Sequence, residues 1–146
     1  MTAEICPGVS ELDHTADVGI SVRAASLREL FHRAALGMFH LVYADETGSA
    51  SSPSPEGIER PIVVEGVDVA ALLVRWLREL LYLDESEAAR YVDATLDDIA
   101  ETRLAGRVRT GSSPTPPVRE LKGVTYHDLE VAREDGGWRA RVVFDV

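Results

Sequence analysis

Three stretches of the chain gather side chains that could do chemistry, and the first lies close to the N-terminus. Asp13, His14 and Asp17 come just before segment 18–22, where apolar residues alternate with smaller or polar ones. Carboxylates are oxygen ligands for divalent cations, and the imidazole could serve as a base or a nitrogen ligand. The alternative is that Asp13 satisfies backbone amides in a turn and that His14 is a surface residue, which is the usual role of a lone histidine.

The last residues of the chain form the second stretch. Segment 141–146 alternates like a strand and then stops, so the carboxylate of Asp145 lies beside the terminal carboxylate of Val146. Two anions this close repel each other unless a cation or a cluster of donors offsets their charge. A divalent ion such as Mg²⁺, Ca²⁺ or Mn²⁺ with oxygen ligands would do so, whereas a frayed and solvated terminus is the alternative.

The third stretch contains the only lysine of the chain. Fourteen of the fifteen basic residues are arginine, and Lys122 is the exception. A coding bias toward arginine explains the fourteen but not the one position that stayed lysine, for which chance retention and a functional requirement are both open. Lys122 falls in a predicted strand after a Pro-rich loop at 110–117, and a strand lysine is usually solvated.

Two amphipathic helices are predicted between these stretches. Ser26 and Glu29 form an S-x-x-E capping box, and the apolar residues that follow at three- and four-residue spacing predict a helix of about four to five turns. Asp68 can cap a second helix, whose apolar stripe extends from Leu72 to Leu81. The polar residues on the opposite side of that helix are Arg75, Arg78 and Glu79.

Strands are predicted around these helices. Strands that are neighbours in sequence usually pair antiparallel. We therefore expect an α+β fold in which two helices pack on one face of a mostly antiparallel sheet. The predicted strands cover residues 18–22, 61–65, 91–99, 102–110, 121–126, 129–133 and 138–144, and a tight turn at 134–137 joins the last two.

The bulk composition limits the classes of function. A chain of 146 residues fits one compact domain, 1–146, and its net charge of −10 disfavours tight direct binding to nucleic acid but suits a basic protein partner or a cation. The single cysteine, Cys6, allows no intramolecular disulfide and agrees with a reducing cytosol. The start of the chain has no signal-peptide pattern and its apolar runs are too short or interrupted to span a bilayer, so we expect a cytoplasmic protein without a membrane partner.

The sequence contains no P-loop, no HExxH motif and no Ser-His-Asp order, so no familiar motif indicates a catalytic nucleophile.

Five sequence blocks, in the same order along nearly the whole chain, resemble those of the archease family. The resemblance implies a fold of two strand-helix-strand-strand modules, one inserted in the other. One departure is Gly123, where the family usually has alanine; glycine loosens a strand. The blocks are residues 13–19 (DHTADVG), 34–39 (AALGMF), 72–82 (LLVRWLRELLY), 121–127 (LKGVTYH) and 144–146 (FDV).

The resemblance also implies an accessory protein rather than an enzyme. Archeases activate the tRNA-splicing RNA ligase: they promote guanylylation of the ligase and allow it to turn over repeatedly in tRNA processing. Matched to the family pattern, Asp17, Asp145 and Val146 would hold a divalent metal ion, either Ca²⁺, Mg²⁺ or Mn²⁺. Lys122 would be essential for activation of the ligase, together with the two aspartates. The minor candidates at this site are Asp13 and His14.

Two other functions stay open at this point. The same acidic ligands could activate water in a stand-alone metal-dependent phosphoesterase, although no general base or second metal set is evident. The chain could instead be a chaperone-like binding module that modulates tRNA methylation. In that case the acidic cluster would only stabilise the fold.

Overall fold

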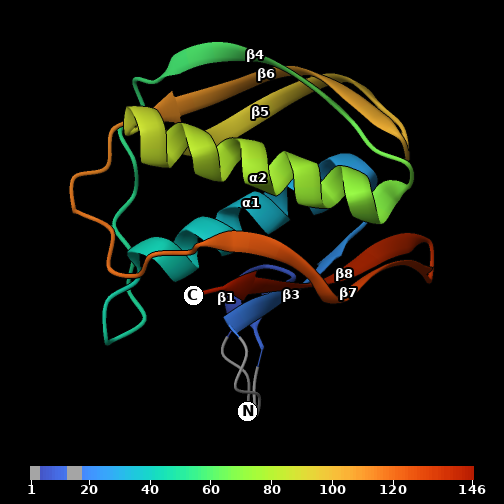
Figure 1. Cartoon of the computed structure of the whole chain (residues 1–146), viewed down its shortest axis with the longest axis horizontal. Coiled ribbons are helices and arrows are strands. Elements are labelled where there is room, and N and C mark those ends of the chain that lie inside the picture. The colour runs from blue at the N-terminus through green and yellow to red at the C-terminus, as the bar shows by residue number, and fades with distance from the viewer. Residues whose placement is uncertain (1–3, 13–17) are drawn as a thin grey trace.

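Eight strands and two helices make up the described part of the computed structural model, residues 4–12 and 18–146. In chain order they are β1 (Glu4–Cys6), β2 (Val9–Glu11), β3 (Val18–Ala24), α1 (Leu27–Tyr43), β4 (Ile58–Glu65), α2 (Val69–Glu87), β5 (Arg90–Ile99), β6 (Arg103–Gly111), β7 (Gly123–Glu134) and β8 (Gly137–Asp145). Five strands form one antiparallel sheet in the order β1-β2-β3-β8-β7, and three form another in the order β4-β6-β5. Both helices lie between the two sheets (Figure 1).

The chain order builds two strand-helix-strand-strand modules, one inserted in the other. The outer module consists of β3, α1, β7 and β8, and the inner module of β4, α2, β5 and β6 comes between α1 and β7. In each module the first strand pairs with the last and the last pairs with the third, always antiparallel. The α+β class, the two helices and the nested modules expected from the sequence are confirmed.

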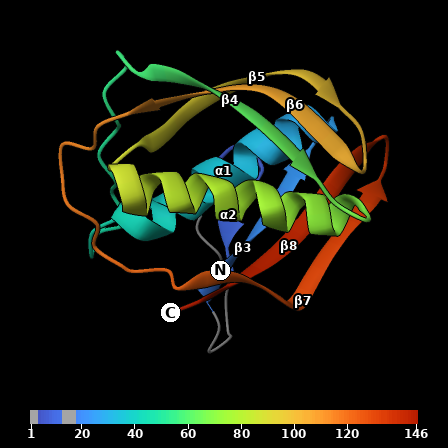
Figure 2. The same cartoon turned by 45° about the horizontal axis from the view of Figure 1, so that its top comes forward.

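The strands are divided between two sheets, one on each side of the helix layer, rather than joined in one sheet (Figure 2). The reason is the width of the buried faces of the helices: ten of the seventeen residues of α1 and nine of the nineteen of α2 are buried. A helix that is apolar over so much of its surface needs cover from more than one side. Although both helices are apolar over much of their surface, neither α1 nor α2 is long and apolar enough to cross a membrane.

The helices begin at the capping residues that the sequence indicated. The hydroxyl of Ser26 accepts a hydrogen bond from the backbone N–H of Glu29 (3.1 Å), and the carboxylate of Asp68 accepts one from the N–H of Ala71 (2.8 Å). Each bond satisfies an amide that has no partner inside the helix. The carboxylate of Glu29 pairs with Arg33 one turn further along α1.

Trp76 connects the two modules in the core. Its side chain is fully buried, and its indole N–H donates a hydrogen bond of 2.9 Å to the carbonyl oxygen of Phe31. Its ring packs against those of Phe31 and Tyr91, with centroids 6.2 and 6.0 Å away. Phe31 belongs to the outer module, whereas Trp76 and Tyr91 belong to the inner one. One hydrophobic core therefore extends across both modules.

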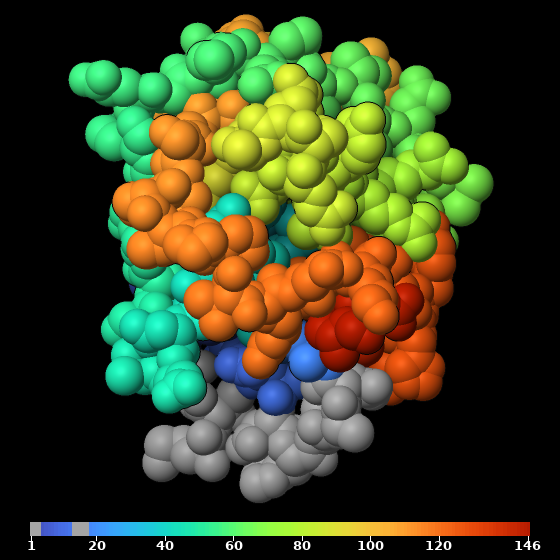
Figure 3. All heavy atoms as spheres, turned by 60° about the vertical axis from the view of Figure 1, so that its left-hand side comes forward, coloured from blue at the N-terminus to red at the C-terminus, as the bar shows by residue number. Residues whose placement is uncertain are grey.

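The Ser- and Pro-rich loop between α1 and β4, residues 44–57, packs on the loop that follows β6, and the latter also packs on the end of α1. The backbone N–H of Ser54 donates to the carbonyl of Ser112 (2.9 Å), and the N–H groups of Val118 and Arg119 donate to the carbonyl of Val42 at 2.7 and 3.0 Å. These bonds lead the chain that follows β6 across the surface (orange in Figure 3) toward the C-terminal residues (red). The start of β7 is thereby positioned beside the end of β8.

β7 is one continuous strand, whereas the sequence predicted two strands at 121–126 and 129–133. The pairing of β7 with β8 shifts register between Thr125 and Glu130, and Asp128 in this stretch has a left-handed backbone with a φ of 53°. An irregularity of this kind bends a strand without ending it. It also interrupts the alternation of side chains, which is why the sequence pattern looks like two separate strands.

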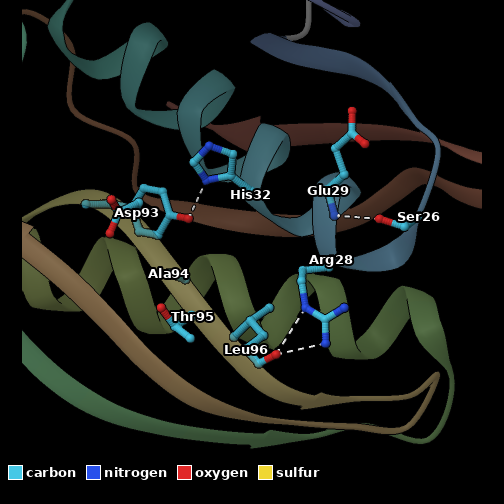
Figure 4. A pocket seen from close by; sticks show the side chains of 9 residues that line it. Ser26, Arg28, Glu29, His32, Asp93, Ala94, Thr95 and Leu96 are labelled. Atoms are coloured by element: carbon cyan, nitrogen blue, oxygen red, sulfur yellow. Dashed lines mark hydrogen bonds between the residues drawn. The ribbon is translucent and has the colours of Figure 1, made fainter.

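Two side chains of α1 bind it to β5 across a pocket of about 390 Å³. Arg28 donates two hydrogen bonds to the carbonyl oxygen of Leu96, at 2.8 and 3.0 Å, and Nδ1 of His32 lies 2.7 Å from the hydroxyl of Tyr91. Figure 4 shows Arg28 and His32 on the side of the pocket opposite β5. The Tyr91 hydroxyl can donate to Nδ1 when the imidazole is neutral. Burial lowers the pKa of His32, which favours that neutral form.

We predict that Gly123→Ala stabilises the protein and that its matched control, Gly106→Ala, destabilises it. A Cβ at Gly123 would meet no atom within 4 Å, so alanine reduces the entropy of the unfolded chain without strain. A Cβ at Gly106 would collide with the carbonyl oxygen of Thr95 in the neighbouring strand. Urea unfolding should show a gain of about 0.4–1 kcal/mol for Gly123→Ala and a loss of about 1–3 kcal/mol for Gly106→Ala. A loss of stability at Gly123 would contradict the prediction.

The contact between His32 and Tyr91 predicts a stability that decreases in mild acid. An unfolded histidine takes up a proton at about pH 6.5, whereas the pKa of folded His32 is lowered. The unfolded state therefore binds more protons as the pH falls through this range, and folding is weakened. Glutamine at position 32 can accept the hydrogen bond but does not titrate. Between about pH 7.5 and about pH 5.5, urea unfolding should show a larger loss for the wild type than for His32→Gln; equal losses would exclude a role for this pair.

Candidate functional site

The site residues predicted from the sequence fall on both sides of the boundary of the described chain. Asp13, His14 and Asp17 lie outside the described residues. The other predicted residues lie inside them, around the start of β7 and the end of β8. These residues are Lys122, Asp145 and Val146.

Lys122 and Asp145 are neighbours. The backbone N–H of Lys122 donates a hydrogen bond of 2.7 Å to the carbonyl oxygen of Asp145, and the next residue, Gly123, pairs with Asp145 in the sheet. Both residues are exposed. The one lysine of the chain therefore lies beside the acidic residue that ends its last strand.

β8 is paired on both edges up to Phe144, and its last residue, Asp145, still pairs with β7. On one side it pairs with β7, and on the other the register with β3 joins Phe144 to Val18, the residue that follows Asp17 in the sequence. Phe144 is buried, whereas Asp145 and Val146 are exposed, Val146 to 58%. The strand is therefore paired and anchored in the core up to the point at which Asp145 emerges, and the frayed end considered from the sequence is not observed.

A tight turn sets the register of this hairpin. Glu134 pairs with Gly137, and the two residues between them, Asp135 and Gly136, have left-handed backbones with φ of 42° and 79°. Two consecutive residues of this kind match the twist of the adjoining antiparallel strands. A slip of one residue would send every side chain of β8 to the opposite face. The turn sets the register as far as the pair of Glu130 with Arg141, and the register shift between Thr125 and Glu130 then brings Gly123, rather than Tyr126, opposite Asp145.

The oxygen donors at this end of the sheet suit a hard divalent cation. Carboxylate and backbone oxygens are the ligands that Ca²⁺ and Mg²⁺ prefer, and both Asp145 and Val146 are accessible. The predicted ligand set also needs Asp17. Within residues 4–12 and 18–146, which do not include Asp17, no three His, Cys, Asp or Glu side chains are grouped closely enough to hold a metal ion.

A hollow of about 590 Å³ lies between α2 and segment 117–121, the segment that precedes Lys122. Its lining includes two acidic residues of α2, Asp84 and Glu85. The hydroxyl of Tyr43 donates to the carboxylate of Asp84, 2.8 Å from each of its oxygens. Burial raises the pKa of Asp84, and the hydrogen bond from Tyr43 opposes that shift only in part. Sequence reasoning missed this carboxyl group.

The spacing of Asp84 along α2 could have indicated that its carboxyl group is buried. Asp84 follows Leu77 and Leu81 on the same apolar stripe of α2, where a carboxyl group must find a partner in the core. The buried guanidinium of Arg90 supplies a compensating charge, lying 4.0 Å from the centre of the Tyr43 ring. Arg90 also donates to Ser113 at 3.1 Å and so ties the loop before β7 to the core. We assign this buried cluster to the fold and not to the chemistry of the site.

The pocket between α1 and β5 is a second place where polar groups gather. Asp93 pairs with Arg109, Glu29 pairs with Arg33, and Arg28 is bound to a carbonyl of β5. The two carboxylates that line the pocket are thus paired with arginines, and the side chain of Arg28 is held in place by β5. This arrangement joins the two modules and gives no reason to place catalysis there.

Comparison with known proteins identifies relatives along almost the full chain. The profile of the Archease protein family (MTH1598/TM1083) matches residues 10–146. The protein archease of Archaeoglobus fulgidus is 39% identical over 140 residues, which cover 92% of this chain and 96% of that protein. The protein archease of Methanosarcina mazei is 33% identical over 142 residues, which cover 92% and 93% of the two chains.

Solved structures agree with these matches. The solution structure of protein 1598 of Methanobacterium thermoautotrophicum has a TM-score of 0.68 and 28% identity, covering 97% of this chain and 100% of that one. The crystal structure of an archease from Thermotoga maritima, described as a possible chaperone, shares the fold with a TM-score of 0.61 at 18% identity, over 92% and 94% of the chains. The resemblance seen in the five sequence blocks is confirmed, and this chain belongs to the archease family.

Proposed function

We propose that this chain is an accessory activator of the tRNA-splicing RNA ligase, which promotes guanylylation of the ligase and its multiple turnover through a divalent-metal site and Lys122. The observation that carries the proposal is the hydrogen bond between the backbones of Lys122 and Asp145 at the exposed end of β8. It brings a cationic side chain and oxygen donors to one point of the surface. Such a combination suits the phosphate groups of a nucleotide held by another enzyme.

The pairing of β3 with β8 supports Asp17 as a further ligand. Val18 lies opposite Phe144 in the sheet, and these residues are bonded in the chain to Asp17 and Asp145. Because consecutive Cα atoms are about 3.8 Å apart, this pairing favours a shared site for the two carboxylates. With the backbone oxygens of Val146 they would supply hard ligands for Ca²⁺, Mg²⁺ or Mn²⁺.

The exposure of these groups favours an accessory role over a stand-alone phosphoesterase. An active site for a small substrate is normally concave, so that it can exclude water and surround the substrate. Lys122, Asp145 and Val146 are all exposed instead. They could therefore enter the active site of a partner, where the bound metal would neutralise phosphate charge. The flexible stem of Lys122 would let its ammonium group reach a phosphate or a carboxylate of the ligase.

We place this activity in the cytosol. Cys6 is free, as expected in a reducing compartment. The net charge of −10 fits contact with a basic protein surface better than tight direct contact with RNA. A chaperone-like module that modulates tRNA methylation is the other proposal for this family, and the following experiment separates it from ligase activation.

Single substitutions at the site should abolish most of the stimulation of the ligase without unfolding the chain. We expect Asp17→Asn, Asp145→Asn and Lys122→Ala each to reduce stimulated guanylylation by about tenfold or more, because each removes either a metal ligand or the ammonium group of the lysine. Glu120→Gln is the matched control, since it neutralises a nearby exposed carboxylate outside the proposed ligand set. The measurement is the rate of ligase–GMP formation with each variant, alongside its circular dichroism spectrum.

Calorimetric titration with Mn²⁺ supplies an independent test of the ligand set. Asp17→Asn and Asp145→Asn should weaken binding by about tenfold or more, whereas Lys122→Ala should not. Stimulation by the two aspartate variants at the wild-type level would remove the metal from the proposal. Hydrolysis of generic phosphoesters by the chain alone would favour the phosphoesterase instead.

A further inference from the structure

The outward side of α2 carries a stripe of exposed side chains. In Figures 1 and 2, α2 lies at the front of the helix layer, between β4 and β7. Arg75, Arg78, Glu79 and Tyr82 are exposed and recur at three- and four-residue spacing, so they follow one side of the helix. This is the polar side of the helix that the sequence predicted, but it includes a large aromatic ring.

Two neighbouring hollows lie along this stripe. One, of about 700 Å³, lies between the start of α2 and Tyr126 of β7, and the other, of about 440 Å³, lies between β4 and α2 and reaches Tyr82. Glu65 and Arg75 line both hollows. The two hollows are therefore adjacent, and we call them together the α2 groove.

Large apolar side chains are concentrated in the α2 groove. Val63, Val67, Tyr82 and Tyr126 line it and are 60%, 89%, 63% and 54% exposed. They are four of the seven large hydrophobic residues that are exposed in the described part of the chain. Clustered apolar side chains that remain in water mark interaction surfaces, and tyrosine and arginine are the residue types enriched at the centre of protein interfaces.

The arginines of the groove differ in how far their charge is compensated. Arg103 is neutralised by two carboxylates. Arg78 donates to the carbonyl oxygen of Val124 at 2.8 Å and lies 5.4 Å from the centre of the Tyr126 ring, which holds its side chain in place but leaves its charge. Arg75 makes no hydrogen bond or ion pair with another described residue. Two cationic groups are therefore available to an incoming partner.

We infer that the α2 groove is a docking surface for a protein segment that carries a carboxylate between apolar side chains. The carboxylate would pair with Arg75, and the apolar side chains would pack on Tyr82 and Tyr126. A nucleic acid strand fits this surface less well, because phosphates require several uncompensated cations. The groove offers Arg75 and Arg78 beside Glu79, in a chain of net charge −10.

The identity of the docking partner rests on the proposed function, under which the segment belongs to the RNA ligase. The groove then provides affinity, whereas Lys122 and Asp145 provide the effect on the active site. The two surfaces are connected through β7, because Arg78 binds the carbonyl of Val124, two residues after Lys122. Because docking and activation rest on different side chains, they should respond to different substitutions.

Stimulation curves separate these two roles. The rate of ligase guanylylation is measured against increasing concentrations of the full chain. Arg75→Glu/Tyr126→Ser should raise the half-saturating concentration by about tenfold or more and leave the maximum within about twofold. Lys122→Ala should lower the maximum with little change in half-saturation. Arg23→Glu/Ile58→Ser makes the same kinds of change at exposed positions outside both hollows and should follow the wild-type curve.

The outcomes distinguish failure of the groove from failure of the proposed function. If the groove double variant follows the wild-type curve while the wild type stimulates, the α2 groove is not the docking surface and the proposed function stands. If the wild type neither binds nor stimulates the ligase, the proposed function and the ligase as occupant both fail. A labelled single-stranded RNA is the third probe: loss of its binding in the groove variant, with an unchanged stimulation curve, would show an RNA surface and overturn the inference.

Discussion

The pairing of β8 with β3 on one edge and with β7 on the other is the constraint on which the outer module depends. β3 comes from the first part of the chain, and β7 and β8 come from its end, so this sheet can close only around the whole inner module. Bringing such distant segments together costs loop-closure entropy. Burial of Ile20, Val142 and Phe144 in the shared core offsets that cost.

This double pairing also explains how an exposed site can be precisely built. The C-terminal part of β8 is buried at residues 142–144, and the next residue, Asp145, is exposed. The loop before β7 is fixed by hydrogen bonds to the end of α1 and by Arg90, so Lys122 arrives at a defined place beside Asp145. A rigid scaffold that presents a few polar groups at its edge is suited to act on another protein's active site. The α2 groove would add the affinity that such a small edge cannot supply.

Much of the secondary structure could be predicted because its causes are local. Capping by Ser26 and Asp68 and the tight turn at 134–137 each depend on residues a few positions apart. The division into two sheets could not be predicted in this way, because it depends on how both helices are covered in three dimensions. The α2 groove was likewise hidden: the polar side of the helix was evident, but the nearby Tyr126 comes from β7.

The periodic patterns of the sequence determined the α+β class, and the resemblance carried by its ordered motif blocks gave the nested modules and the archease family. The sequence also singled out Lys122 and Asp145, which the resemblance assigns to one functional site. Only the tertiary structure decided how they meet, through a hydrogen bond between their backbones. The physical reason is register: the pairing of β7 with β8, with the register shift between Thr125 and Glu130 and the burial of Phe144, is what brings Lys122 beside Asp145.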